Sequence, residues 1–294
     1  MNKSKALLLS SRPWSFPMTL GSVLVGSLLA AKAGGLDLLN MVLVALGTVV
    51  LHAAANLTND YFDFKEEVDR AGSPTTRYRD QPLVEKWFDP GELKIYFSLL
   101  YFSGAAIGGY LTYVAGPMVL VIGTLGILAG YFYTGGVSYK YLGWGELAVF
   151  LVWGPLIVTG SYYVQTGSLG LTPVLVSIPL GLLVALTLLA NNLRDRDYDE
   201  NAGVTTIANL VDKKDAVVLY LLLTVGTYSI LGYLILDGVL TGWSALGFLS
   251  FPLAYKLLKT FIAEVPDDAD ARTARLDSVF SGLLTVSLLL ELVL

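Results

Sequence analysis

The sequence predicts an all-α, polytopic membrane protein with nine transmembrane helices. Hydrophobic residues make up 54% of its 294 residues and charged residues only 15%, whereas soluble domains carry about 25% charge. The apolar residues gather in stretches of about 20 residues, which is the length that a helix needs to cross a bilayer. The predicted spans lie at about 14–31, 38–58, 93–114, 116–133, 147–164, 171–190, 216–236, 240–258 and 279–294.

The composition excludes several classes of protein. The chain has no cysteine, which rules out disulfides, zinc–thiolate sites and thiol nucleophiles. Its single histidine argues against a His-rich metal site, and its net charge of −5 leaves no dominant basic patch for nucleic acid. We therefore expect one transmembrane domain over residues 1–294, with the lipid bilayer as a partner and no nucleic acid.

The basic residues fall on one side of the predicted spans. With nine spans, 18 of the 19 Lys and Arg residues lie on the side of the N-terminus, and only Lys32 lies on the other. The positive-inside rule then places the N-terminus in the cytoplasm and the C-terminus outside the cell membrane. The longer cytoplasmic loops are expected at 59–92, 191–215 and 259–278.

The span at 38–58 leads into a cluster of acidic and amide side chains. Continued as a helix at about 100° per residue, it places five of them on one face. These are Asn56, Asn59, Asp60, Asp63 and Glu67. Asp69 falls off that face and is expected in the loop. His52 lies on the same face, either as a hydrogen-bonded packing residue or as a base that deprotonates a substrate.

The span at 171–190 ends in a similar cluster. Asn191, Asn192, Asp195 and Asp199 share one face if the helix continues. Both spans run inward, so the two acidic stripes emerge on the same side of the membrane. Spans one to four and five to eight therefore form two similar halves, with a ninth helix added, around a central cavity.

Two facing stripes of carboxylates repel each other unless cations lie between them. Mg²⁺ prefers oxygen ligands and is usually bound by one or two carboxylates together with substrate phosphates. The pattern predicts two Mg²⁺ ions bridged by a substrate diphosphate, where they offset charge on the departing pyrophosphate. The candidate metal ligands are Asn59, Asp60, Asp63, Glu67, Asn192, Asp195 and Asp199. An ion-coupled transporter is the alternative from another class, although transporter sites usually lie near the membrane midplane.

The two clusters, on the second and sixth of nine spans, resemble the UbiA superfamily of intramembrane prenyltransferases. The matching motifs are Asn59-Asp60-x-x-Asp63-x-x-x-Glu67, whose last position is Asp in the family, and Asp195-x-x-x-Asp199. Tyr133 and Lys140 also match a family pair that follows the fourth span. Within the superfamily, stretches such as 59–65 and 191–195 are most similar to the branch that prenylates 1,4-dihydroxy-2-naphthoate in menaquinone biosynthesis.

The resemblance implies Mg²⁺-dependent transfer of an isoprenyl group from a polyprenyl diphosphate to an aromatic acceptor. It implies catalytic roles for Asp63, Asp195, Lys140 and Tyr133. Basic side chains complement a diphosphate, and the candidates are Arg70, Arg77, Arg79, Lys140 and Arg194. The alternative within the superfamily is geranylgeranyl transfer to a glycerol-phosphate acceptor in ether-lipid synthesis.

Overall fold

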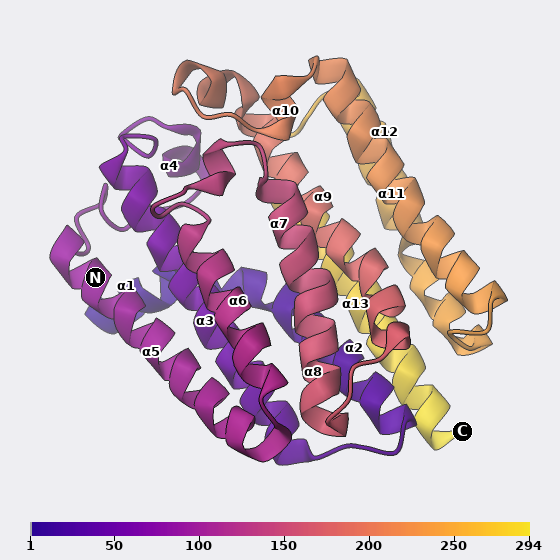
Figure 1. The fold of residues 1–294 in the computed structure, drawn as a ribbon. Coiled ribbons are helices and arrows are strands. Elements are labelled where there is room, and N and C mark those ends of the chain that lie inside the picture. The colour runs from indigo at the N-terminus through magenta and orange to yellow at the C-terminus, as the bar shows by residue number, and fades with distance from the viewer. Residues whose placement is uncertain (1) are drawn as a thin grey trace.

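The computed structural model describes residues 2–294, which form helices and connecting loops (Figure 1). The main helices of the bundle are α2 (Phe16–Lys32), α3 (Leu38–Lys65), α5 (Pro90–Ala115), α6 (Met118–Phe132), α7 (Gly145–Leu151), α8 (Ile157–Thr166), α9 (Leu171–Asn201), α11 (Lys213–Leu236), α12 (Phe251–Ala263) and α13 (Ala269–Val293). The other helical segments are α1 (Lys3–Ser10), η1 (Pro13–Ser15), α4 (Pro74–Tyr78), η2 (Tyr139–Tyr141), η3 (Val152–Leu156), α10 (Ile207–Leu210) and η4 (Gly242–Ser250). The expected all-α class is confirmed.

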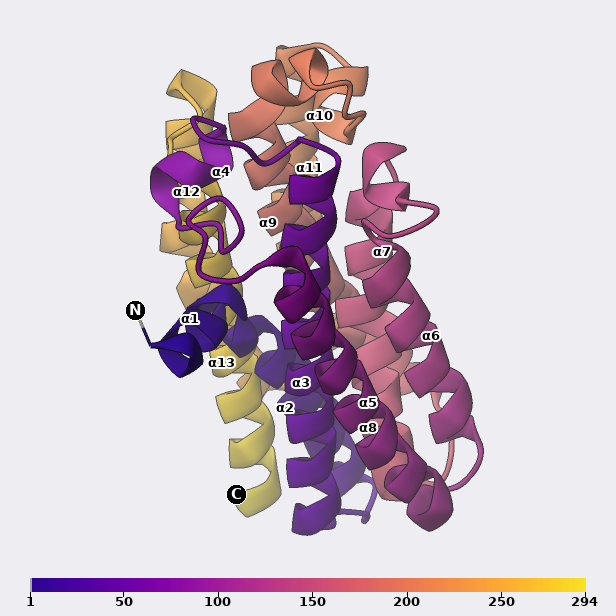
Figure 2. The ribbon, with the colours of Figure 1, turned by 90° about the vertical axis from the view of Figure 1, so that its left-hand side faces the viewer.

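Eight helical segments among residues 2–294 are long and apolar enough to cross a membrane. They include three composite segments, α1–η1–α2, α7–η3–α8 and η4–α12. The remaining expected span, the fourth at 116–133, corresponds to α6, which has 15 residues and is shorter than the usual spanning length. The long helices run side by side, whereas α1 lies at an angle to them (Figure 2).

Three helices extend well beyond the apolar stretches that predict them. Helix α3 continues to Lys65 and α9 to Asn201, so each carries acidic residues past its apolar part. Helix α13 begins at Ala269 and α12 ends at Ala263, which leaves 264–268 as the only non-helical part of the expected loop 259–278. Residues 269–278 are rich in Ala and Arg, which favour helix without adding enough hydropathy to indicate a span.

Helix α9 lies at the centre of the fold and contacts α7, α11 and α13. A large buried cluster joins it to α2, α11, α12 and α13 through side chains such as Leu183, Leu231 and Phe280, each fully buried. Large apolar side chains also cover the outside of the bundle, where Tyr113 and Leu236 are about 90% exposed. Such a surface suits contact with lipid rather than with water.

Small residues allow close helix contacts around the composite span α7–η3–α8. A Cβ atom at Gly26 in α2 would lie 2.3 Å from the Val158 carbonyl oxygen, so only glycine fits there. The wider turn η3 contains Pro155, which has no N–H to donate to the preceding turn. Gly154 in this turn packs directly against Gly181 of α9.

Candidate active site

A cavity of about 930 Å³ runs between the helices. Its wall on α3 extends from Val44 to Asp63, which spans about 29 Å at 1.5 Å per residue and approaches the thickness of a bilayer's hydrocarbon core. Most of the lining is apolar. Polar residues gather where α3 and α9 end, and we call this the acidic end. Both helices end on the side of the bundle that carries α4 and α10 (Figure 1).

Asp60 is fully buried and is held by two arginines. The guanidinium of Arg12 contacts Asp60 Oδ1, and Arg79 Nη2 donates to the same oxygen at 2.7 Å. The backbone carbonyl of Asp60 accepts from Gln81 at 2.8 Å. A buried carboxylate paired in this way is fixed in place and already neutralised, because a buried charge without partners is very costly.

Asp63 lies one turn further along α3 and faces the cavity. Lys140 Nζ donates to Asp63 Oδ2 at 2.8 Å and lies 3.3 Å from the Asn59 side-chain oxygen. Tyr141 donates to the other Asp63 oxygen, and Asn59 Nδ2 donates to Oδ2 at 2.7 Å. Burial alone would lower the pKa of Lys140, but the Asp63 charge outweighs it and raises that pKa, so the ammonium group stays charged.

The last residue of the acidic stripe on α3 is not the one that the sequence predicts. The helix stops at Lys65, and Glu67 has a left-handed backbone (φ 59°) and an exposed side chain. The chain turns back, so the Asp69 amide donates to the Asp63 carbonyl at 2.8 Å and the Asp69 side chain is buried. Asp69, expected off the stripe, therefore takes the place beside Asp63 that we expected for Glu67. Burial and the Asp63 charge raise the pKa of Asp69 to about 6.

The second stripe, on α9, is organised around Arg194. Its Nε and Nη2 atoms donate to the two oxygens of Asp195, each at 2.7 Å, and Nη1 donates to Asp270 at 2.7 Å. The Tyr78 ring lies 4.0 Å from the guanidinium carbon. Arg194 thus joins α4, α9 and α13 at the acidic end.

The two amide side chains of this stripe, Asn191 and Asn192, point in different directions. Asn192 is buried and donates to Glu146 of α7 at 2.9 Å, whereas Asn191 lines the cavity and accepts from Arg194 at 2.8 Å. Asp199 lies close enough to Lys140 and Asp63 for their charges to act on it. Within the stripe, Asp199 is therefore a carboxylate that lies near the first cluster, whereas Asp195 is held by Arg194.

Loop contacts bring the two acidic helix ends together. The Tyr198 hydroxyl of α9 donates to the Val68 carbonyl, just beyond α3, at 2.8 Å. Leu142 and Thr205, from the loops after α6 and α9, form a short parallel bridge. The two clusters consequently lie at one end of the bundle, as their sequence positions predict.

Three further predicted residues have clear positions. Tyr133 lines the cavity, with its ring centre 5.9 Å from Lys140 Nζ and 5.5 Å from the Tyr139 ring centre. Arg70 and Arg77 are exposed and form no ion pair among residues 2–294. The proximity of Arg12 to Asp60 was not apparent from the sequence, because 48 residues separate them.

The carboxylates at the acidic end fit a magnesium site that a substrate completes. Among residues 2–294, no three acidic or histidine side chains converge to hold a metal unaided. Mg²⁺ usually needs only one or two carboxylates when phosphates supply other oxygens. Oδ2 of Asp69 is buried without a hydrogen-bond partner. This oxygen and the cavity-facing Asp63 are donors of the type that Mg²⁺ prefers.

Comparisons with known proteins agree on one family. The model of the UbiA prenyltransferase family matches residues 19–281. UbiA prenyltransferase domain-containing protein 1 of Xenopus tropicalis is 33% identical over 94% of this chain and 79% of its own length. The protein of the same name from Homo sapiens is 32% identical over 94% of this chain and 80% of its own length.

Solved structures share the fold at low sequence identity. A UbiA homolog from Aeropyrum pernix K1 has a TM-score of 0.72 and 17% identity over 99% of both chains. A UbiA homolog from Archaeoglobus fulgidus, bound to GPP and Mg²⁺, has a TM-score of 0.71 and 16% identity over 98% of this chain and 100% of its own. The chain belongs to the UbiA prenyltransferase family and is a membrane-embedded prenyltransferase.

Proposed function

We propose that the protein is a Mg²⁺-dependent enzyme that transfers the isoprenyl group of a polyprenyl diphosphate to an aromatic acceptor. The acceptor that we propose is 1,4-dihydroxy-2-naphthoate, in menaquinone biosynthesis. The main support is the cavity, whose acidic end carries paired carboxylates and basic side chains and whose remaining length is apolar. A diphosphate head and a hydrocarbon tail are complementary to these two regions.

The basic residues that line the cavity favour an aromatic over a phosphorylated acceptor. Within residues 2–294 these are Arg12, Arg79 and Lys140. A prenyl diphosphate already requires them, so a second phosphate on the acceptor would lack a cationic partner. A dihydroxynaphthoate carries a single carboxylate and an aromatic ring, which can pack against the aromatic side chains of the cavity, such as Tyr133 and Trp153. Glycerol-phosphate acceptors remain the competing substrates to be tested.

The proposed metal ligands follow the geometry of the acidic end. Asn59, Asp63 and Asp69 would contribute from one side, and Asp195 and Asp199 from the other, with two ions bridged by the diphosphate. Asp60 is fully buried and paired with two arginines, Arg12 and Arg79, so it is not included. Glu67, which is exposed, and Asn192, which donates to Glu146, are not included either. Asp195 pairs with a single arginine, Arg194, and is retained. When bound, Mg²⁺ would supply Lewis-acid neutralisation of the leaving pyrophosphate.

The protein's own residues would position both substrates. Lys140, Arg79 and Arg12 would bind diphosphate oxygens, with Lys140 kept charged by Asp63. As the bond between the prenyl carbon and the diphosphate oxygen breaks, the ring of Tyr133 would shield the allylic cation by cation–π contact. The acceptor carbon then forms the new carbon–carbon bond and loses its carboxylate as carbon dioxide.

We propose that the acidic end and the N-terminus both lie on the cytoplasmic side of a cell membrane. The support is the distribution of Lys and Arg, which follows the positive-inside rule. Membership of a prenyltransferase family also favours bond formation over the alternative of ion-coupled transport.

An acceptor panel tests this proposal. Purified protein in detergent would be given geranylgeranyl diphosphate, Mg²⁺ and either 1,4-dihydroxy-2-naphthoate or geranylgeranylglyceryl phosphate, and products would be identified by mass spectrometry. We expect a prenylated naphthalenediol, whose mass is that of the two substrates less pyrophosphoric acid and carbon dioxide, and no product in EDTA. If only geranylgeranylglyceryl phosphate gave a product, the proposed acceptor would be wrong. Full turnover in EDTA would show that the enzyme does not require a metal.

A further inference from the structure

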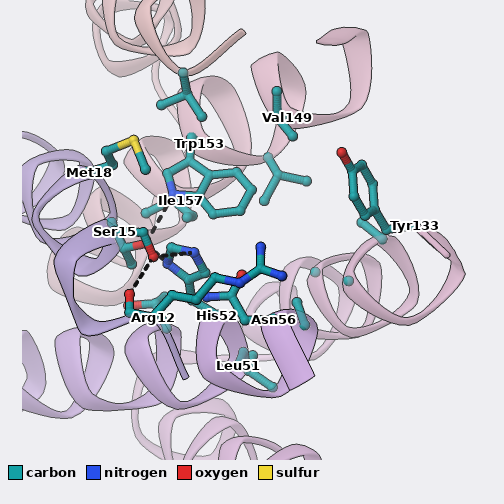
Figure 3. Close-up of a pocket in the computed structure, with 18 of the residues that line it drawn as sticks. Arg12, Ser15, Met18, Leu51, His52, Asn56, Tyr133, Val149, Trp153 and Ile157 are labelled. Carbon is teal, nitrogen blue, oxygen red and sulfur yellow. Dashed lines mark hydrogen bonds between the residues drawn. The ribbon is translucent and has the colours of Figure 1, made fainter. Parts of the chain in front are cut away.

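A continuous row of polar side chains lines the cavity between Trp153 and Arg12 (Figure 3). Trp153 of η3 donates its indole N–H to Thr19 Oγ1 of α2 at 2.9 Å. Thr19 Oγ1 lies 2.8 Å from His52 Nδ1 of α3, and His52 Nε2 lies 3.2 Å from Ser15 Oγ of η1. Ser15 Oγ donates to the Arg12 carbonyl at 2.7 Å. The row therefore connects four segments of the chain.

The direction of these hydrogen bonds fixes the state of the histidine. The Ser15 hydroxyl has a single proton, which it gives to Arg12, so Ser15 accepts from His52 Nε2–H. Thr19 accepts from Trp153 and gives its own proton to His52 Nδ1. Every N–H and O–H in the row then has an acceptor, with His52 neutral and protonated on Nε2. Because the Nδ1 lone pair accepts this hydrogen bond, it is not available to take a proton from a substrate.

The row ends on an unusual backbone residue. Arg12 has a left-handed conformation (φ 56°, ψ 60°), which is unfavourable for a residue with a side chain. Its carbonyl is held by Ser15, and the neighbouring Ser11 carbonyl accepts from Asn56 of α3 at 2.9 Å. The Arg12 guanidinium meanwhile contacts Asp60. Backbone strain of this kind persists when surrounding contacts determine it.

We infer that His52 is a positioning residue, which holds the Arg12 backbone through Ser15 and so directs the Arg12 guanidinium to the acidic end. The inference rests on the proposed function in one respect, that Arg12 binds the substrate diphosphate. The rings of Phe16 and Trp153 contact the imidazole edge to face, with centroids 5.5 and 5.0 Å away, and keep it in the plane that serves both bonds.

A spectroscopic test needs no turnover. The chain has one histidine, so ¹⁵N-histidine labelling of untagged protein gives the signals of His52 alone. At neutral pH we expect the Nε2–H tautomer, with Nδ1 shifted by an accepted hydrogen bond. Thr19→Val should move the Nδ1 resonance, and Ser22→Ala should not, since the Ser22 hydroxyl bonds only the Met18 carbonyl of its own helix. An Nδ1–H tautomer, or protons on both nitrogens, would overturn the inference.

Kinetics separate positioning from general packing. Ser15→Ala removes the hydroxyl that joins His52 to the Arg12 carbonyl and keeps the bond from the Ser15 backbone N–H to that carbonyl, at 2.9 Å. His52→Asn removes the Nε2 donor while keeping an amide near Nδ1. Both should raise KM for the prenyl diphosphate by about threefold to tenfold, as expected for one lost hydrogen bond, with kcat changed less than about twofold. His52→Gln places an amide N–H near the Nε2 position and should restore most of the affinity.

The outcomes distinguish this inference from the proposed function. If kcat falls in Ser15→Ala and His52→Asn while KM stays constant, His52 acts in the chemical step and the positioning role is wrong. Equal KM values in Ser15→Ala, Ser22→Ala and the parent protein would also overturn it. If no acceptor is prenylated by the parent protein, the proposed function fails, and the ¹⁵N spectrum still decides whether the hydrogen-bonded row exists.

Discussion

At the residue scale, one backbone conformation decides which acidic side chains meet. The left-handed turn at Glu67 folds the chain back, so that Asp69 rather than Glu67 lies beside Asp63. A helix extended from 100° periodicity places Glu67 on the stripe and Asp69 off it. Nothing in the local sequence marks Glu67 for positive φ, since such positions usually carry Gly or Asn. The sequence therefore predicts the cluster but misplaces its last member.

Asp63 is the residue on which the site depends most directly. Asp63→Asn removes the negative charge that faces the cavity and pairs with Lys140. We expect turnover to fall by about a hundredfold or more, because even outer-shell changes at metal sites cost about 10- to 100-fold. The measurement is the initial rate at saturating Mg²⁺, with circular dichroism to establish that the variant is folded. A rate within a few-fold of the parent's would contradict the assignment.

Asp69 and Glu67 provide a matched comparison. Asp69→Asn removes a buried carboxylate beside Asp63, whereas Glu67→Gln changes an exposed side chain only two residues away. We expect Asp69→Asn to reduce the apparent affinity for Mg²⁺ by about tenfold and Glu67→Gln to leave it unchanged. Mg²⁺ titrations of the initial rate give both values. The reverse ranking would show that Glu67 turns inward in the working enzyme.

At the element scale, hydropathy identified the positions of the helices better than their ends. Apolar runs predict the cores of α3 and α9 but not their extensions to Lys65 and Asn201. These extensions are polar, and contacts such as those of Arg194 with Asp195 and Asp270 stabilise them. Contacts between residues far apart in the chain cannot be predicted from the periodicity of the sequence. The same reason explains the early start of α13. The turn η3, which presents Trp153 to the cavity, likewise depends on packing of Gly154 against α9.

The contact between α2 and α8 gives an element-scale prediction. Gly26→Ala places a methyl group 2.3 Å from the Val158 carbonyl oxygen, so the two helices must separate. Overpacking costs about 1–3 kcal/mol, and we expect Tm to fall by several degrees. Gly282→Ala in α13 is the control, since a Cβ there meets nothing within 4 Å. Thermal unfolding in detergent compares them; equal Tm values would show that the α2–α8 contact is not tight.

At the scale of the whole molecule, the absence of cysteine allows a clean test of orientation. Glu200 at the end of α9 and Asp237 after α11 are both exposed, at opposite ends of the bundle. In intact cells we expect a membrane-impermeant maleimide to label Asp237→Cys and not Glu200→Cys. Permeabilised cells should show labelling of both and so provide the control. Labelling of Glu200→Cys in intact cells would place the acidic end outside.

The length of the cavity has a consequence for what the enzyme can discriminate. An isoprenoid dissolved in the bilayer already sits among hydrocarbon chains, so entering an apolar channel of similar depth gains little from the removal of water. Each added isoprene unit then contributes little to affinity, because it exchanges one oily environment for another. The enzyme would consequently tolerate donors of several lengths and choose among lipids by the charged headgroup that reaches its acidic end.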